Sequence, residues 1–324
     1  MYLIGLDIGG TKCAVSLGAL SGGNRLTILE KIKFPTEKRS PDAVLQQFLQ
    51  QLDALMKKHA LCYAQIAGIG VSCGGPLDSR RGVVLSPPNL PGWDEVHVTR
   101  FFTEHTGLPC WLQNDANACA VAEWKYGAGK GCENMVFLTF GTGLGAGVIL
   151  NGHLYSGSTD NAGEIGHVRL TPDGPVGYRK AGSAEGWCSG GGLAQIGRYA
   201  VQEAIRDGKE PLLWLRAERD EKNITAKLIG DLAEQENDPL CLDIYRTCGE
   251  RLGQALSILI DLLDPDLIVL GGIYMRSAAL LRPHIERVIG QEALHGCPIA
   301  AAGLGEQVGD YAALSIAAMN AANA

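Results

Sequence analysis

Apolar residues occur along this chain in short runs, and most runs end at glycine or at short polar side chains. The first run extends from Tyr2 to Leu17 and is interrupted at Gly9-Gly10. Because glycine tolerates positive φ angles, this pair predicts a hairpin turn between two strands. A third strand is predicted over residues 26–34.

The rest of the chain alternates between helical and strand patterns. Apolar residues three and four positions apart predict a helix from Ser40-Pro41 to His59. Further strands are expected at 66–71, 108–112, 135–150 (a second hairpin) and 266–273, and further helices at about 94–105, 194–207, 226–235, 240–263, 283–289 and 309–322. This alternation is typical of α/β proteins.

The second predicted hairpin repeats the first. It contains Gly141-Thr142-Gly143-Leu144-Gly145 between two apolar strands, and Gly143 follows Gly10 by 143 − 10 = 133 residues. We interpret this similarity as an internal repeat of two α/β halves, each with a glycine turn that can hold phosphate.

A polar corner follows the strand predicted at 108–112. It reads Asn114-Asp115-Ala116-Asn117, and helix-forming residues come next. The corner places a carboxylate at the carboxyl edge of a sheet, where open α/β folds bind ligands, so Asp115 is a candidate general base. The alternative is that these residues only turn the chain and cap the helix. Taken alone, the local sequence favours capping.

The first hairpin carries polar residues of its own. Asp7 lies in an apolar strand, where a carboxylate is costly without a partner, and it could hold a water bound to Mg²⁺. Thr11 and Lys12 follow the glycine pair, beside backbone N–H groups that could hold phosphate oxygens. The alternative is an ordinary hairpin.

Other candidate residues lie on loops rich in glycine or proline. Asn89 lies between prolines and could bind a hydroxylated ligand through its amide. Glu164 and His167 are flanked by glycines and could converge on a small polar ligand. Gly271-Gly272 ends a buried strand, where a flat ring such as adenine could lie against the backbone. Each of these loops could instead be a structural connection.

Composition limits the classes of function. A chain of 324 residues predicts two domains, at 1–117 and 118–308, with the C-terminal helix at about 309–324 packing back on the first. The net charge of −7 argues against nucleic-acid binding.

Location and redox state also follow from the sequence. No apolar run approaches the ~20 residues of a membrane span, and the N-terminus shows no signal-peptide pattern, so we expect a cytoplasmic protein without membrane attachment. The ten cysteines form no C-x-x-C pair, which favours free thiols over disulfides or a cysteine-based metal site.

Six short motifs occur in an order that spans nearly the whole chain. They are Asp7-Ile8-Gly9-Gly10-Thr11-Lys12, Asn89-Leu90-Pro91-Gly92-Trp93, Asn114-Asp115-Ala116-Asn117, Gly141-Thr142-Gly143-Leu144-Gly145, Gly163-Glu164-Ile165-Gly166-His167 and Gly271-Gly272. Each is weak alone. In this order and at these spacings the chain resembles the ROK family (repressors, open reading frames and sugar kinases).

The resemblance implies two actin-like (ribonuclease H-like) α/β domains with an interdomain cleft, and ATP-dependent phosphorylation of a hexose hydroxyl. Asp115 would accept the proton of that hydroxyl, in a reaction that needs mainly positioning and charge neutralisation. The resemblance further implies sugar binding by Gly75, Asn89, Asn114, Asp115, Glu164, His167 and Glu185. It implies binding of ATP and Mg²⁺ by Asp7 (near the metal), Gly9, Gly10, Thr11, Lys12, Thr142, Gly143, Gly271 and Gly272.

One departure from the family pattern concerns zinc. Many members carry a zinc site written C-x-C-G-x-x-G-C, followed by an apolar residue and Glu. Counting back from Glu185, the three cysteine places hold Val176, Tyr178 and Ser183, and only the fourth ligand, His167, is kept. Val and Ser cannot replace thiolates, so no structural zinc is expected.

The loop at 171–186 must then be held in another way. Cys188 lies in the wrong place to supply a missing zinc ligand. We expect packing through Tyr178 and Trp187 to hold the loop instead.

Three functions are compatible with these motifs. The first is a glucokinase-like enzyme, because the Asn89 loop favours glucose; N-acetylmannosamine, fructose and allose are alternative sugars. The second is a sugar-responsive repressor, which in this family carries an N-terminal helix-turn-helix that the few residues before Asp7 cannot form. The third is a non-catalytic sugar sensor or regulator, which the retained acidic residues disfavour. The family also implies a homo-oligomer, most simply a dimer.

Overall fold

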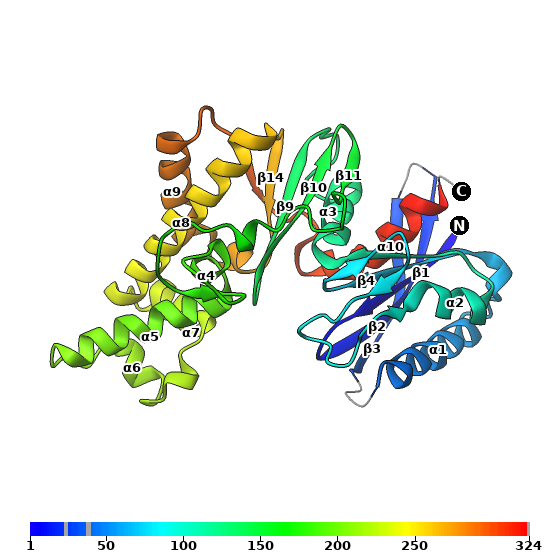
Figure 1. The fold of residues 1–324 in the computed structure, drawn as a ribbon, viewed down its shortest axis with the longest axis horizontal. Helices are drawn as coiled ribbons and strands as arrows, with labels where there is room; N and C mark the ends of the chain where they lie inside the picture. The colour runs from blue at the N-terminus through cyan, green and yellow to red at the C-terminus, as the bar shows by residue number, and fades with distance from the viewer. Residues whose placement is uncertain (23–24, 37–39, 323–324) are drawn as a thin grey trace. The chain divides into compact units, whose positions relative to one another are not determined.

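The computed structural model describes residues 1–22, 25–36 and 40–322 (Figure 1). Contacts divide the chain into two compact units. Unit 1 comprises Met1–Gly131, Gly147–Ala162 and Gly303–Ala324, and unit 2 comprises Cys132–Ala146 and Gly163–Ala302. The boundary expected between residues 117 and 118 falls inside a helix of unit 1, so the observed units divide the chain elsewhere.

Unit 1 is built on a five-stranded sheet in the order β3-β2-β1-β4-β8. The bounds are Tyr2–Ile8 for β1, Lys12–Ser21 for β2, Arg25–Pro35 for β3, Ile66–Cys73 for β4 and Cys110–Asn114 for β8. Strands β1 to β3 pair antiparallel, whereas β4 and β8 join parallel. The predicted first hairpin and third strand are confirmed.

Alternating side chains of β1 point to opposite faces of this sheet. Ile4 and Leu6 belong to the core that also contains residues of α1 (Pro41–Lys58) and α2 (Val98–Thr106). On the other face, Leu3 packs with α10 (Val308–Ala321). A Cβ atom on Gly70 would lie 2.0 Å from the Ala313 carbonyl oxygen, so α10 lies directly against the backbone of β4.

Helix α10 therefore belongs to unit 1. The helix bears out the 309–322 expectation closely. Residues 323–324 of the wider 309–324 range lie outside the described residues.

A small antiparallel sheet corrects one helix boundary. It contains β5 (Leu77–Asp78), β6 (Val83–Val84) and β7 (Val96–His97). The helix predicted from Asp94 begins at Val98 instead, because residues 96–97 pair with β6.

A second five-stranded sheet repeats the strand order of the first. It has the order β11-β10-β9-β14-β15, with β14 parallel to both β9 and β15 and β10 antiparallel to β11. Contacts assign β9, β14 and β15 to unit 2, and β11 and the residues of β10 from Gly147 onward to unit 1. The bounds are Met135–Phe140 for β9, Leu144–Leu150 for β10, His153–Tyr155 for β11, Leu267–Leu270 for β14 and Ile299–Ala301 for β15. The same strand order in both sheets confirms the internal repeat.

One helical core covers this second sheet. The helices are α4 (Ala184–Trp187), α5 (Gly190–Arg206), α6 (Leu212–Arg216), α7 (Ala226–Gln235), α8 (Pro239–Leu263) and α9 (Ile273–Glu292). Two predicted helices were too short. Helix α5 begins at Gly190 because Ser189 caps it, its Oγ accepting from Gly192 N at 2.9 Å. Helix α9 starts ten residues before Pro283 and is kinked at Ser277.

Helix α3 (Asp115–Tyr126) follows β8. The remaining elements are short: the hairpin strands β12 (Val176–Gly177) and β13 (Lys180–Ala181), and the 3₁₀ turns Tyr63–Gln65, Ile165–His167, Glu221–Asn223 and Gly305–Gln307. Over the described ranges, none of the helices combines the length and the apolar composition that crossing a bilayer requires.

Candidate active site

Asp115 is the first residue of α3, directly after β8. Asn114 caps this helix, because its Oδ1 accepts from Ala116 N at 2.9 Å and from Asn117 N at 3.4 Å. The Asp115 Oδ1 accepts from Ala116 N at 2.8 Å. The cap is therefore provided mainly by Asn114, and the second carboxylate oxygen of Asp115 is not needed for it.

The carboxyl group of Asp115 is partly desolvated by the surrounding protein. Nearby protein raises the pKa of its carboxyl by desolvation, while the hydrogen bond from Ala116 N acts in the opposite direction. The residue is nevertheless exposed, so solvent still reaches it. A carboxylate in this position can meet a ligand and is a stronger proton acceptor than an ordinary Asp.

A buried amide network holds this corner from behind. Gln113 Oε1 accepts from Asn114 N at 2.8 Å and from Asn117 Nδ2 at 3.1 Å. The two amide nitrogens also donate to Ser156 Oγ, at 3.3 Å from Gln113 and 3.4 Å from Asn117. Gln113 and Asn117 are buried. Because their amides are paired with each other and with the backbone, they restrict the start of α3.

Three loops of unit 1 meet at Asn89. A Cβ atom on Gly10 would lie 2.4 Å from the Asn89 carbonyl oxygen. A Cβ atom on Gly74 would lie 3.4 Å from Asn89 Nδ2 and 3.9 Å from Asp115 Oδ2. The structure therefore brings the first hairpin, the loop after β4 and the Asn89 loop together beside Asp115.

Gly75 and Asn114 complete this group. A Cβ atom on Gly75 would lie 3.3 Å from Asn114 Nδ2. The amides of Asn89 and Asn114 offer donors and acceptors on either side of the glycine loop. Sequence reasoning identified all of these residues except Gly74.

Asp7 lies near the end of β1, at the same sheet edge as Asp115. It is paired in register with Ser72 of β4, which is paired with Gln113 of β8. Burial raises the pKa of Asp7 to about 6; nearby Lys31 and Lys33 lower it, and Asp115 raises it further. Asp7 is thus an anionic site that a cation would stabilise.

The first glycine turn needs its glycines. A Cβ atom on Gly9 would lie 2.5 Å from the Lys12 carbonyl oxygen. Thr36 Oγ1 donates to the Gly9 carbonyl oxygen at 2.6 Å and so holds the turn. Thr11 and Lys12 are exposed at its tip, where they can contact an anion.

In unit 2, the second glycine turn lies against Glu185. Glu185 Oε2 accepts from Leu144 N at 3.1 Å, and a Cβ atom on Gly143 would lie 2.6 Å from the same oxygen. Thr142 is exposed at the tip of the turn. Only a glycine at position 143 allows the carboxylate to come this close.

The segment that carries Glu164 and His167 passes close to the same turn. A Cβ atom on Gly166, between them, would lie 2.1 Å from the Leu144 carbonyl oxygen and 3.3 Å from Glu185 Cβ. Both Glu164 and His167 are exposed. The backbone between Glu164 and His167 therefore lies beside Glu185 and the second glycine turn.

Gly271 and Gly272 follow β14. Gly272 has φ 61°, and a Cβ atom on it would lie 2.0 Å from the Phe140 carbonyl oxygen and 3.3 Å from Gly141 N. The turn from β14 to α9 therefore requires glycine and lies beside the second glycine turn. The structural interpretation and the nucleotide-binding interpretation are compatible here.

The residues at the zinc-ligand places do not fit a zinc ion. Ser183 Oγ accepts from Gly186 N at 3.2 Å and caps α4, and Val176 and Tyr178 have exposed side chains without a suitable donor set. Cys188 is buried and its Sγ donates to the Cys248 carbonyl oxygen at 3.6 Å. Within the described ranges, no three His, Cys, Asp or Glu side chains are grouped to hold a metal.

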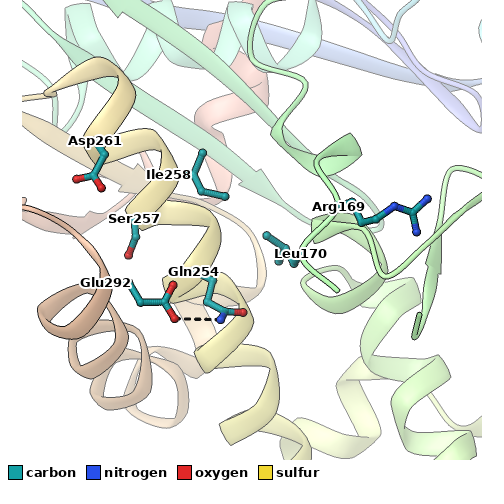
Figure 2. A pocket seen from close by; sticks show the side chains of 7 residues that line it. All are labelled: Arg169, Leu170, Gln254, Ser257, Ile258, Asp261 and Glu292. Atoms are coloured by element: carbon teal, nitrogen blue, oxygen red, sulfur yellow. Dashed lines mark hydrogen bonds between the residues drawn. The ribbon is translucent and has the colours of Figure 1, made fainter. Parts of the chain in front are cut away.

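A surface hollow lies elsewhere in unit 2 (Figure 2). It has a volume of about 230 Å³ and is lined by Arg169, Leu170, Gln254, Ser257, Ile258, Asp261 and Glu292. None of the predicted site residues lines it. Gln254 Nε2 donates to Glu292 Oε1 at 3.0 Å, so these two lining side chains are paired with each other.

Sequence reasoning did not identify the supporting residues Gln113, Asn117 and Ser156 as a group. A polar Gln in an otherwise apolar strand was a usable signal for the first of them. Ser156 carries no local signal, because only the fold brings residues 147–162 into unit 1.

The chain is similar to known proteins over nearly its full length. Residues 3–319 match the model of a family described as the ROK family. A glucokinase of Halalkalibacterium halodurans is 30% identical over 315 residues, which cover 95% of this chain and 92% of that protein. A xylose repressor of Bacillus spizizenii is 27% identical over 269 residues, which cover 83% of this chain and 63% of that protein.

A solved structure shows the same fold. The crystal structure of a ROK family glucokinase from Streptomyces griseus in complex with glucose and AMPPNP matches with a TM-score of 0.78 and 27% identity. The match covers 98% of this chain and 100% of that one. The predicted fold class, two actin-like α/β domains, is thereby shown.

Proposed function

The chain belongs to the ROK family, and from this premise we propose that it is an ATP-dependent kinase of a hexose hydroxyl. The observation that carries the proposal is the position of Asp115, an exposed carboxylate of raised pKa at the start of α3. Its neighbours Asn89 and Asn114 offer amides to a hydroxylated ligand. The similarity to glucokinases supports a sugar as that ligand.

In this proposal Asp115 accepts the proton of the attacking hydroxyl. The oxygen Oδ1 stays bound to Ala116 N, which leaves Oδ2 to receive the proton. A base on a rigid helix start acts by holding the nucleophile in line with the phosphoryl group. Asn89, Asn114 and the backbone at Gly75 would bind sugar hydroxyls, and Glu164, His167 and Glu185 would do the same.

The two glycine turns would hold the phosphates of ATP. Gly9, Gly10, Thr11 and Lys12 would contact the transferred phosphate, Thr142 and Gly143 the inner phosphates, and Gly271 and Gly272 the adenosine. Mg²⁺ bound with ATP would neutralise phosphate charge. Asp7 would hold that ion through a water or a phosphate, since a cation stabilises a carboxylate whose pKa burial raises to about 6.

Removing the proposed base tests this function. We expect glucose- and Mg²⁺-dependent ADP formation by the wild type, and a fall in kcat of roughly 10²- to 10⁴-fold in Asp115→Ala. Glucose binding measured by calorimetry should survive, because the amides remain. Asp42→Ala, at an exposed carboxylate of α1, serves as the control and should keep full turnover. Normal turnover of Asp115→Ala would refute the assignment.

A non-catalytic regulator is the second candidate, because the xylose repressor is also similar to this chain. Such a protein would bind a sugar in the calorimeter without releasing ADP. A chain that binds sugar but forms no ADP with any sugar would favour the regulator.

The identity of the sugar is a separate part of the proposal. Glucose is favoured because the glucokinases are similar over nearly the whole chain. A comparison of glucose, N-acetylmannosamine, fructose and allose in the ADP assay identifies the preferred substrate as the one with the highest kcat/KM.

A further inference from the structure

The β12–β13 hairpin has a two-residue tip at Tyr178 and Arg179. Both residues have positive φ angles, 38° and 66°, as a tight hairpin turn of this kind requires. The strands pair Val176 with Ala181 and Gly177 with Lys180. The turn therefore places Tyr178 at the tip, and Lys180 next to the tip, on a defined backbone.

The tip contacts His167 in two ways. The ring of Tyr178 lies edge-on to the His167 imidazole, with ring centroids 6.1 Å apart and an angle of 70° between the planes. Lys180 Nζ donates to the His167 carbonyl oxygen at 2.7 Å. One contact restricts the ring of His167 and the other restricts its backbone.

The base of the hairpin is anchored to α5. Gln195 Oε1 accepts from Val176 N at 3.0 Å, and Gln195 Nε2 donates to the Val176 carbonyl oxygen at 2.9 Å. This paired hydrogen bond continues the ladder of the hairpin with a side chain. The first strand of the hairpin is therefore tied to a long helix of the unit.

The other side of the hairpin is tied to the segment after His167. The Gly182 carbonyl oxygen accepts from Leu170 N at 2.8 Å and from Thr171 N at 3.1 Å. Arg169 Nη1 donates to the Ala181 carbonyl oxygen at 2.7 Å. Trp187 Nε1 donates to Thr171 Oγ1 at 2.8 Å. The loop at 171–186 is thus held by hydrogen bonds and by the Trp187 ring, from which a Cβ atom on Gly174 would lie 2.5 Å.

The hairpin also lies against Glu185. A Cβ atom on Gly177 would lie 2.5 Å from Gly186 N and 2.7 Å from Glu185 Cβ. One anchored hairpin therefore contacts both His167 and Glu185, which come from different segments of unit 2.

We propose that the β12–β13 hairpin is a metal-free support that orients His167 for the sugar, with Tyr178 as its main positioning residue. This inference rests on the proposed function, in which His167 contacts a sugar hydroxyl. His167 is exposed, so without a neighbouring ring its imidazole could take several rotamers. The Tyr178 ring keeps the imidazole in a single rotamer. Less conformational entropy of His167 is then lost when the sugar binds.

Substitution of Tyr178 tests the positioning role. In Tyr178→Ala we expect the Kd and the KM for glucose to rise by about tenfold, which corresponds to about 1.4 kcal/mol of binding free energy. The value of kcat at saturating sugar and the KM for ATP should stay within about twofold. Tyr178→Phe should behave like the wild type, because the contact uses the ring and not the hydroxyl. Tyr199→Ala removes another exposed tyrosine, on α5, and should change nothing.

A second readout does not depend on sugar binding or turnover. The imidazole NMR signals of His167, assigned by their loss in His167→Asn, should move in Tyr178→Ala and stay in place in Tyr199→Ala. Unmoved His167 signals, or unchanged glucose affinity in Tyr178→Ala, would overturn the proposal. So would stoichiometric zinc in the purified protein that is lost in His167→Asn. If the signals move as expected but the wild type binds no sugar, the support of His167 holds and the proposed function is what fails.

Discussion

At the scale of single residues, the two candidate site carboxylates of unit 1, Asp7 and Asp115, differ in their environment. Asp115 is exposed and hydrogen-bonded by Ala116 N, whereas Asp7 is partly buried in β1. Desolvation raises the pKa of both. Asp7 therefore has an ionisation that folding disfavours, which is typical of a site adapted to a ligand rather than to stability.

The stability of the ligand-free protein should report this cost. The pKa of Asp7 is 3.8 in the unfolded chain and about 6 in the folded protein. The free energy of unfolding therefore decreases as the pH rises through this range, because the unfolded chain ionises more readily. Asp7→Asn removes the charge, so the variant should be more stable than the wild type at pH 8, by at most about 3 kcal/mol, and similar to it at pH 4. Urea denaturation at both pH values measures the difference. A gain of equal size at the two pH values would contradict the assignment, and Mg²⁺-dependent turnover should be lost in the same variant.

At the scale of elements, the start of α3 depends on groups outside the helix. Asn114 caps it, and Gln113 holds both the Asn114 N–H and the Asn117 amide. Ser156 reaches the same amides from the segment after β11. Asp115 is thus positioned by a strand end, a helix start and a distant loop together.

Loss of the Gln113 acceptor should affect stability and turnover together. Gln113→Met keeps the length of the side chain but leaves the Asn114 N–H and part of the Asn117 amide without a partner, at a cost of about 1–3 kcal/mol. We expect kcat to fall more than sugar affinity, because the base is displaced while Asn89, on another loop, keeps its place. Gln202→Met, at an exposed glutamine of α5, is the matched control. A variant with the stability loss but unchanged kcat would show that the network supports the fold and not the base.

At the scale of the whole molecule, one buried carboxylate ties together distant parts of unit 1. Glu123 of α3 accepts from Ala128 N at 2.8 Å, Gly303 N at 2.9 Å and Leu304 N at 2.9 Å. These residues lie near Gly131, where the chain first leaves unit 1, and at Gly303, where it returns for the last time. Glu123 therefore closes unit 1 around α10.

Removal of this carboxylate should loosen unit 1 and spare unit 2. Glu123→Ala leaves three backbone N–H groups unpaired, and we expect a loss of roughly 2–5 kcal/mol. Hydrogen exchange followed by mass spectrometry should show faster exchange in peptides around residues 128 and 303–314, whereas peptides of α8 should keep their protection. Glu104→Ala, on the exposed surface of α2, provides the comparison. Uniform loosening of both units would contradict a local role.

The sequence by itself determined the repeated hairpins, most helices and the group of candidate residues. These features follow from local sequence patterns. Gly10 and Gly143 indicate turns, the spacing of apolar residues indicates helices, and Asn114-Asp115 indicates the point where a strand ends and a helix begins. The alternative interpretations of Asp115 could not be separated locally, because capping and catalysis use the same residue types. Asn114 takes the capping role only in the folded chain.

The tertiary structure alone decided what depends on distant pairing. The start of α2 was shifted because residues 96–97 pair with β6, a partner that helical spacing does not reveal. Gln113 donates to Ser156, 43 residues further along the chain, and Lys180 of the β12–β13 hairpin donates to His167 across 13 residues. Such contacts depend on the path of the whole backbone, whereas turns and helices depend on neighbouring residues. Local sequence patterns therefore determine turns and helices but do not determine contacts between distant segments.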